Sequence, residues 1–93
     1  MKFRLATEAD LPEIVRLLAD DHLGGSRERY TDPLPPDYGI AFAGLQKIGA
    51  EVILAEDESG KVIGCLQLLV LPGLGSLGKQ RAQIEAVRIE SSC

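Results

Sequence analysis

The sequence predicts a single α+β (α/β) domain in which a strand and two helices are followed by a three-stranded antiparallel segment. Two patterns predict it: apolar residues recur at helical spacing in the first half, and β-branched or alternating runs fill the second half. The 93 residues are 45% apolar and 26% charged, as expected of one small globular domain. A domain of this size buries only about 60–65% of its unfolded surface, so we expect a thin core.

The first strand is expected over residues 3–6, where apolar side chains alternate with a basic one. Thr7 and Asp10 follow and resemble a capping box, with Asp in place of the usual Glu. Apolar residues then recur at helical spacing as far as Leu18. This pattern predicts a first helix over residues 8–21.

The second helix is expected after Pro35 and Pro36, since apolar residues recur at helical spacing from Tyr38 to Ile48. Residues 26–37, which precede and overlap its start, are polar and contain three prolines. They predict a loop between the two helices.

The second half predicts strands. Residues 52–55 and 62–71 are apolar or β-branched runs joined by a polar turn that ends in Gly60, which favours an antiparallel hairpin. Residues 72–78 are rich in glycine and predict a further turn. Residues 81–91 alternate loosely with apolar side chains on both faces, which is typical of a strand inside a sheet.

Charge, cysteine content and hydropathy argue against three classes of protein: nucleic-acid-binding, metal- or disulfide-stabilised, and membrane-associated. The net charge of −4 disfavours nucleic acid as a partner. Cys65 and Cys93 form neither a CxxC pair nor a disulfide framework, so we expect no metal site and a reducing cytoplasm. The longest apolar stretch, residues 62–77, is broken by glycines and Pro72, and no targeting leader precedes it, so we expect no membrane association.

A glycine motif at residues 73–78 fits GxGxxG and directly follows a predicted strand, as in a dinucleotide-binding turn. With Lys79 it also approaches a phosphate-binding P-loop, but Gln80 stands where a Ser or Thr is needed to coordinate magnesium. The segment that follows has strand character, and the P-loop class needs a longer chain. We therefore expect a flexible hairpin loop here, with nucleotide binding as the weaker alternative.

Glu85 is the most informative single residue, because an unpaired carboxylate is costly to bury in an otherwise apolar strand. A carboxylate held there is suited to act as a general base toward an ammonium substrate, directly or through water. A salt bridge to Arg81, or exposure if the strand lies at an edge, explains the residue equally well. His22 is the only histidine and is expected to cap the first helix rather than to bind metal.

Acidic and aromatic side chains of the first half are candidates for contact with a substrate. Asp21 and its acidic neighbours are suited to attract a cationic amine, although acidic residues at helix ends and in loops are usually only solvated. Tyr30, Tyr38 and Phe42 are suited to line a pocket, although Tyr38 and Phe42 lie at helical spacing and also fit a core.

These segments together resemble the GCN5-related N-acetyltransferase (GNAT) family over nearly the whole chain. Residues 3–11 with the helical run that follows resemble its first strand and helix. Residues 52–66 are similar to its second and third strands, and residues 83–89 resemble its fourth. The resemblance implies the N-terminal part of a GNAT-like acyl-CoA N-acyltransferase fold.

The resemblance also implies a reaction: transfer of an acetyl group from acetyl-CoA to a primary amine of a small molecule or peptide, without a metal. The backbone of Val87, Arg88 and Ile89 would then run beside the pantetheine arm, with amides that polarise the thioester carbonyl. Glu85 lies in the region of strand four from which many members supply a base. Asp21 and Tyr30 fall on the substrate-facing wall.

The family places its acetyl-CoA pyrophosphate loop directly after strand four, where this sequence stops. Residues 1–93 are therefore expected to form an incomplete GNAT-like domain that is inactive alone. An unpaired edge of strand four favours a homo-oligomer or complementation by a separate C-terminal segment. The alternative is a non-enzymatic α/β module whose exposed sheet edge binds another protein.

Overall fold

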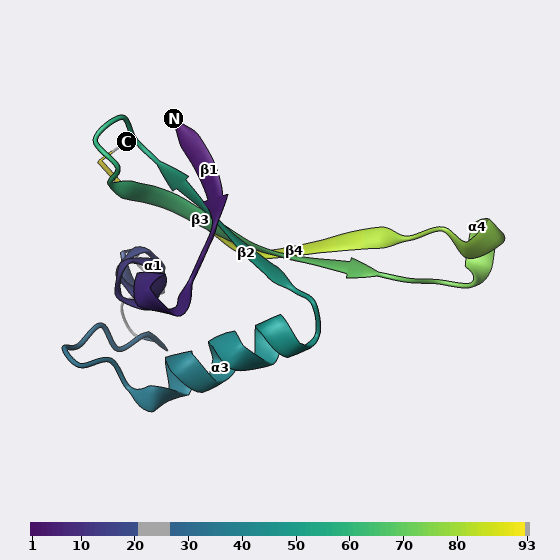
Figure 1. Ribbon diagram of the computed structural model, residues 1–93, viewed down its shortest axis with the longest axis horizontal. Coiled ribbons are helices and arrows are strands. Elements are labelled where there is room, and N and C mark those ends of the chain that lie inside the picture. The colour runs from purple at the N-terminus through teal and green to yellow at the C-terminus, as the bar shows by residue number, and fades with distance from the viewer. Residues whose placement is uncertain (21–26, 93) are drawn as a thin grey trace.

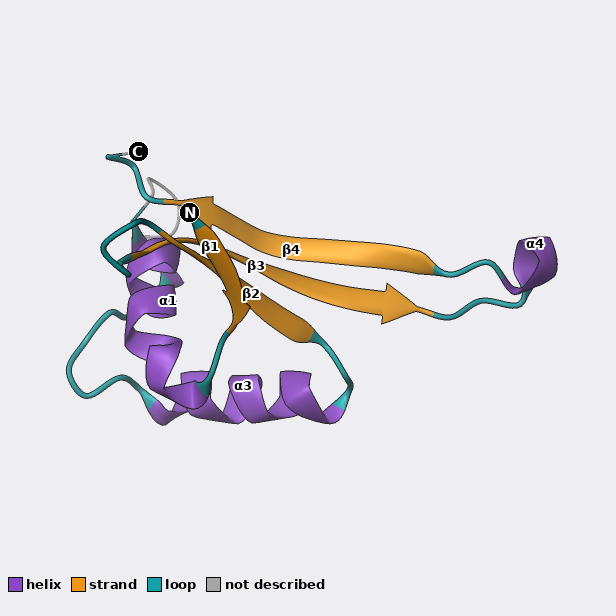
Figure 2. Cartoon of the chain, turned by 45° about the horizontal axis from the view of Figure 1, so that its top comes forward, coloured by secondary structure: helices purple, strands orange, loops and turns teal. Residues whose placement is uncertain are grey.

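The computed structural model describes residues 1–20 and 27–92 as an antiparallel four-stranded sheet with helices on one face (Figures 1 and 2). The strands lie in the order β1 (Lys2–Leu5), β2 (Glu51–Glu56), β3 (Val62–Leu71) and β4 (Arg81–Ile89). The helical elements are the 3-10 turn η1 (Glu8–Asp10), α1 (Leu11–Ala19), α3 (Pro36–Lys47) and the short α4 (Gly75–Gly78). The predicted α+β order of elements is confirmed.

The start of the first helix follows the predicted capping box. The Thr7 backbone N–H donates to Asp10 Oδ2 (2.8 Å), and the Asp10 N–H donates to the Thr7 carbonyl (2.9 Å). The first turn is 3-10 rather than α-helical, and α1 ends at Ala19. The predicted end at residue 21, like the cap predicted at His22, lies outside the described residues.

Arg4 ties β1 to the helix start and to β2. Its guanidinium donates two hydrogen bonds to the Asp10 carboxylate, each 2.8 Å long, and one to Glu56 Oε2 at 2.9 Å. These hydrogen bonds from Arg4, assisted by Thr7, hold the pKa of Asp10 well below its usual range. The carboxylate therefore stabilises the fold in its charged form.

Acid is expected to remove this contribution. The pKa of Asp10 is depressed in the folded state, so the unfolded chain binds more protons as pH falls below the ordinary value of 3.8. The free energy of unfolding should then fall, and Asp10→Asn should lack this part of the acid dependence. Urea unfolding of both proteins at pH 7, 4 and 3 measures their unfolding free energies. A stability difference between them that stays constant with pH would contradict the assignment.

The core lies between α1 and the helix-facing side of the sheet. Leu54 of β2 is fully buried, and Cys65 of β3 stands opposite it in the register. Amphipathic spacing in α1 directs its apolar stripe onto these strands. The buried cluster consists of Ile14, Leu17, Leu54, Val62 and Cys65.

No described element covers the other side of the sheet. Register places Phe3, Ala55, Gly64 and Ile89 in line across the four strands on this side, and Phe3 and Ile89 are each 70% exposed. Val87 is also exposed. We call this side the open face.

In the described chain β4 is an edge strand. The prediction that it lies inside the sheet is therefore wrong for these residues, while the predicted unpaired edge is confirmed. Apolar residues on both faces of a strand indicate surface that favours burial, but they do not indicate whether both edges are paired.

The outer half of the β3–β4 hairpin projects beyond the helices as an arm (Figures 1 and 2). The GxGxxG segment forms its tip and returns the chain directly into β4, with Leu71 paired to Arg81. A nucleotide-binding turn needs a helix at this point, whereas α4 has four residues and contains left-handed φ angles at Ser76 and Leu77. The hairpin prediction is confirmed, and the two nucleotide-binding alternatives are excluded.

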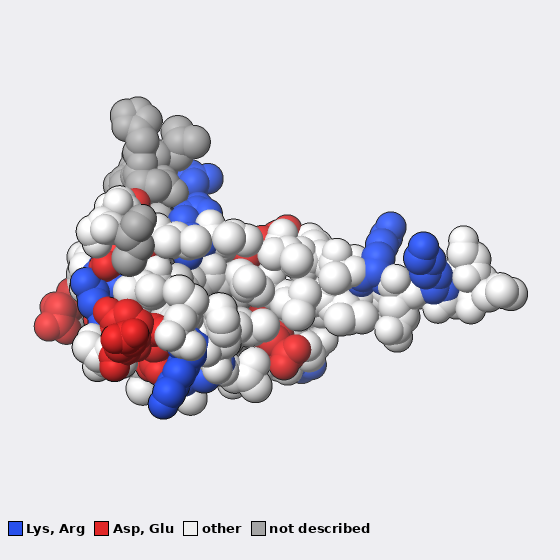
Figure 3. Space-filling model, turned by 90° about the horizontal axis from the view of Figure 1, so that it is seen from above, with Lys and Arg blue, Asp and Glu red and all other residues white. Residues whose placement is uncertain are grey.

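The charge of the arm differs from that of the rest of the chain. The sequence between Lys61 and Glu85 contains no acidic residue, while Lys79 and Arg81 are basic (Figure 3). Leu74 and Leu77 at the tip are 99% and 105% exposed. The negative net charge therefore belongs to the body of the domain, not to the arm.

Candidate active site

A β-bulge in β4 is the most distinctive feature of the backbone. Cys65 pairs with Arg88 and Gln67 pairs with Glu85, so two residues of β4 stand opposite Leu66. The first of the two, Ala86, has a left-handed φ of 53°. A bulge of this kind bends the strand and leaves the extra residue outside the regular ladder of hydrogen bonds.

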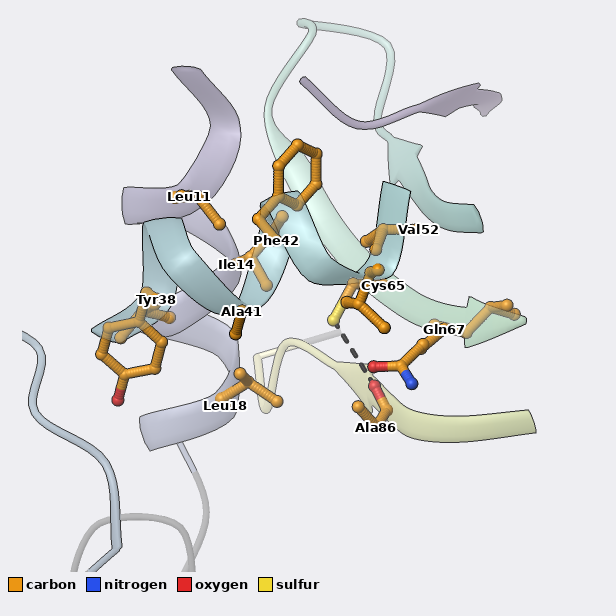
Figure 4. Close-up of a pocket in the computed structure, with 13 residues that line it drawn as sticks. Leu11, Ile14, Leu18, Tyr38, Ala41, Phe42, Val52, Cys65, Gln67 and Ala86 are labelled. Carbon is orange, nitrogen blue, oxygen red and sulfur yellow. Dashed lines mark hydrogen bonds between the residues drawn. The ribbon is translucent and has the colours of Figure 1, made fainter. Parts of the chain in front are cut away.

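The Cys65 side chain fastens the bulge to the core. Its thiol donates to the Ala86 carbonyl over 3.6 Å (Figure 4). Burial raises the pKa of Cys65, which keeps the sulfur protonated and able to donate. The orientation of the Ala86 peptide is therefore linked to a buried residue of β3.

Substitution of Ala86 tests the bulge directly. A left-handed φ costs an L-residue about 1–2 kcal/mol, and a β-branched side chain more. We expect Ala86→Gly to stay within about 1 kcal/mol of wild type, because relief of strain and greater unfolded-state entropy nearly cancel. Ala86→Val should lose more than about 1 kcal/mol of unfolding free energy, measured with urea. Equal stability of the valine and alanine proteins would count against the bulge.

An apolar groove of ≈150 Å³ lies between the two helices and the sheet and reaches the bulge (Figure 4). Helix α1 contributes one wall, α3 the second, and β2 and β3 the floor, with Ala86 at the end. Its lining residues include Leu11, Ile14, Leu18, Tyr38, Ala41, Phe42, Leu45, Val52, Cys65, Leu66, Gln67 and Ala86.

The polar groups of the groove are few. The Tyr38 hydroxyl points away from it, where it donates to Glu28 Oε1 (2.8 Å) and accepts from the Arg29 N–H (3.0 Å). Burial is the main cause of the raised pKa of Tyr38. The Gln67 amide points toward the Ala86 end of the groove (Figure 4). Gln67 therefore presents the main free polar group at this end.

Glu85 of β4 is a second polar residue close to this end of the groove. It is the register partner of Gln67, and directly opposed residues of an antiparallel pair share a face of the sheet. Its Oε1 accepts a hydrogen bond from Gln83 Nε2 at 2.7 Å. The side chain is exposed, as expected under the alternative of an edge strand: β4 is an edge strand, and this part of it does not lie beneath the helices.

The end of β4 is fixed by ion pairs from Glu90 to α1 and to Lys61, which directly precedes β3. Glu90 Oε1 lies 2.7 Å from Arg16 Nη1 and 3.0 Å from Lys61 Nζ, and Arg16 Nη2 also donates to the Val62 carbonyl (2.8 Å). Hydrogen bonds from Lys61, Ser92 and Arg16 lower the pKa of Glu90. The backbone that follows the bulge therefore leaves the sheet in a defined direction.

The structure separates the residues that the sequence singled out. Glu85 lies next to the bulge, while the Val87 and Ile89 side chains belong to a shallow hollow on the open face. Tyr30 is 52% exposed and borders a different hollow, beside Pro12. Asp21 lies outside the described residues.

Three residues of the site were missed by sequence reasoning. Gln67 carried a usable signal, because it interrupts an apolar strand. Cys65 lies inside an apolar run, which indicates burial but no role in the site. Ala86 carried no signal, since alanine rarely adopts a left-handed φ.

Within residues 1–20 and 27–92, no three His, Cys, Asp or Glu side chains gather as a metal site requires. In the same ranges no helix has the length and apolar character needed to cross a membrane.

The chain is similar to several solved structures. A transcriptional regulator from Bacillus halodurans C-125 matches with a TM-score of 0.88 and 43% identity, over 98% of this chain and 61% of that chain. A protein classed as an acetyltransferase from Agrobacterium tumefaciens matches with a TM-score of 0.79 and 26% identity, over 99% and 60%. Glucosamine-6-phosphate N-acetyltransferase from Arabidopsis thaliana matches with a TM-score of 0.71 and 18% identity, over 98% and 60%.

The chain thus spans about three fifths of the length of these structures. No model of a protein family matches the sequence, and no curated protein matches it either. The order of strands and helices defines the N-terminal part of an acyl-CoA N-acyltransferase fold. This is the fold of GCN5-related N-acetyltransferases, of which the chain has the N-terminal part.

Proposed function

We propose that this chain forms the acceptor side of an enzyme that transfers an acetyl group from acetyl-CoA to a primary amine, with Glu85 as general base. The observation that carries the proposal is the bulge of β4, which stands at the end of an apolar groove and next to a carboxylate. The acetyltransferase fold of the structural neighbours supports the same reaction.

The bulge supplies the electrophilic part of the proposed site. A residue outside the hydrogen-bond ladder has a backbone N–H available for another acceptor. A backbone N–H directed at the acetyl carbonyl would stabilise negative charge as that oxygen becomes tetrahedral. In this proposal the backbone of Val87, Arg88 and Ile89 continues the path along which the pantetheine arm lies.

Glu85 supplies the base. Glu85 lies on the helix-facing side, opposite Gln67 and directly before Ala86, and these two neighbours both line the groove. The amine nitrogen attacks the acetyl carbon, Glu85 accepts the proton released from nitrogen, and the C–S bond breaks to release the CoA thiolate, which solvent protonates. Because Glu85 is exposed, it can pass the accepted proton to water.

Titration of the ¹⁵N-labelled chain with acetyl-CoA tests the proposal. We expect amide shifts to concentrate at residues 86–89. Shifts scattered over the surface, or none at millimolar acetyl-CoA, would contradict it. The latter result would favour the interaction-module alternative, which is supported by the exposed apolar side chains of the open face.

We further propose that the chain is inactive alone and works in the cytoplasm, either as a homo-oligomer or with a complementing C-terminal segment. The open face and the unpaired edge of β4 provide the surface for such contacts. Asp21 and Tyr30 remain proposed substrate contacts. Sedimentation velocity on the isolated chain should show self-association, and a monomer at every concentration would argue against the homo-oligomer.

A further inference from the structure

The groove beside the bulge has a composition that selects among amines. Among the described residues, its lining contains no Lys, Arg, Asp or Glu. The Tyr38 hydroxyl is directed outward to Glu28, and the Cys65 thiol is engaged by the Ala86 carbonyl. A sugar or phosphate placed there would lose its hydrogen bonds to water without replacement. Arg88, the register partner of Cys65, is a cation outside this lining.

The size of the groove sets the size of its occupant. Its volume of ≈150 Å³ equals that of the engineered apolar cavity, of about 150 Å³, that binds benzene. A single aromatic ring or a branched alkyl group of similar size therefore fits between α1 and α3. The groove is open to solvent at Ala41, so such a group has a path of entry.

A carboxylate lies just outside the groove lining, at Glu85 of β4, which pairs with Gln67 and directly precedes Ala86. Gln67 and its register partner Glu85 present an amide oxygen and a carboxylate beside the bulge. An ammonium group held there would have its apolar body in the groove and its nitrogen next to Ala86. The apolar groove and the polar groups beside it are thus arranged in the same order as the ring and the ammonium group of an arylalkylamine.

We propose that the acceptor is a primary amine on a compact apolar body, an arylalkylamine or branched alkylamine, and not an amino sugar phosphate. This inference rests on the proposed function for the reaction, but the binding that it requires does not depend on acetyl-CoA. It separates this chain from the plant neighbour, whose name specifies glucosamine 6-phosphate.

Calorimetric titration of the 93-residue chain without acetyl-CoA tests the inference with three probes. We expect 2-phenylethylamine to bind at least tenfold more tightly than 2-phenylethanol, which has the same body without the charge. Glucosamine 6-phosphate should show no saturable binding. Glu85→Gln should remove the preference for the amine over the alcohol.

A matched pair of variants locates the binding site. Ala41 lines the groove from α3, whereas Ala43 is exposed on the same helix outside it. Ala41→Phe should fill the groove and weaken phenylethylamine binding at least tenfold, and Ala43→Phe should not. If Ala41→Phe misfolds by circular dichroism, amide shifts in the wild-type chain serve instead and should fall on Leu18, Phe42 and Gln67.

Equal affinity for amine and alcohol, tighter binding of glucosamine 6-phosphate, or equal loss in both alanine variants would overturn the inference. A separate assay for acetylated product distinguishes it from the proposed function. In a preparation of this domain that is active, acetylation of polar amines with no binding of phenylethylamine would refute the inference alone. Binding of phenylethylamine as described, with no amide shifts from acetyl-CoA, would refute the proposed function alone.

Discussion

Glu85→Gln is expected to lower the turnover number for acetyl transfer about 100-fold to 10,000-fold at pH 7, in any preparation of this domain that is active. An alkylamine is almost fully protonated at this pH, and its nitrogen must lose a proton to become a nucleophile. Glutamine keeps the size of the side chain and the hydrogen bond with Gln83 but cannot accept that proton. Thiol release with acetyl-CoA and an amine in excess measures the change.

The pH profile of Glu85→Gln separates loss of a base from loss of structure. Without the base, the rate should rise about tenfold per pH unit toward the pKa of the free amine, as the substrate loses its proton to solvent. Glu58→Gln, at the β2–β3 turn far along the chain from the bulge, serves as the control and should retain full turnover. A loss of turnover that is independent of pH would assign Glu85 a structural role only.

Most of the fold could be predicted because its signals are local. Helical spacing located α3 to within a residue of its observed end, and Gly60 adopts the left-handed φ that the β2–β3 turn requires. The capping pair at Thr7 and Asp10 located the start of the first helix. Each of these features depends on residues a few positions apart, so the sequence contains the information.

The site was less predictable because its parts meet through register. Whether Glu85 faces the groove depends on its pairing with Gln67 and on the two-residue bulge that follows. A shift of one residue would turn the carboxylate to the open face. Alanine at position 86 does not indicate a left-handed φ. This conformation is held by tertiary contacts such as the hydrogen bond from Cys65. Tertiary contacts of this kind leave no periodic pattern.

Leu54→Ala is expected to lose about 2–5 kcal/mol of unfolding free energy. Leu54 is fully buried in the centre of β2 and packs in the cluster with Ile14, Leu17 and Cys65, so its truncation leaves a cavity under α1. A domain of this length has a total stability of only roughly 5–15 kcal/mol. The loss is therefore large enough to populate the unfolded chain near physiological temperature.

Leu74→Ala provides the matched control for Leu54→Ala, since it removes the same atoms from a side chain that is 99% exposed at the tip of the arm. Its unfolding free energy should stay within about 0.5 kcal/mol of wild type. Urea titrations followed by circular dichroism measure the unfolding free energies of wild type and both variants, and the comparison holds where the dependence on urea concentration is the same in all three.

A small effect of Leu54→Ala would mean that the groove, which adjoins this cluster through Cys65, relaxes to fill the cavity. Phenylethylamine affinity would then fall in Leu54→Ala although the domain stays folded, because the space that admits an aromatic ring would be occupied by the collapsed core.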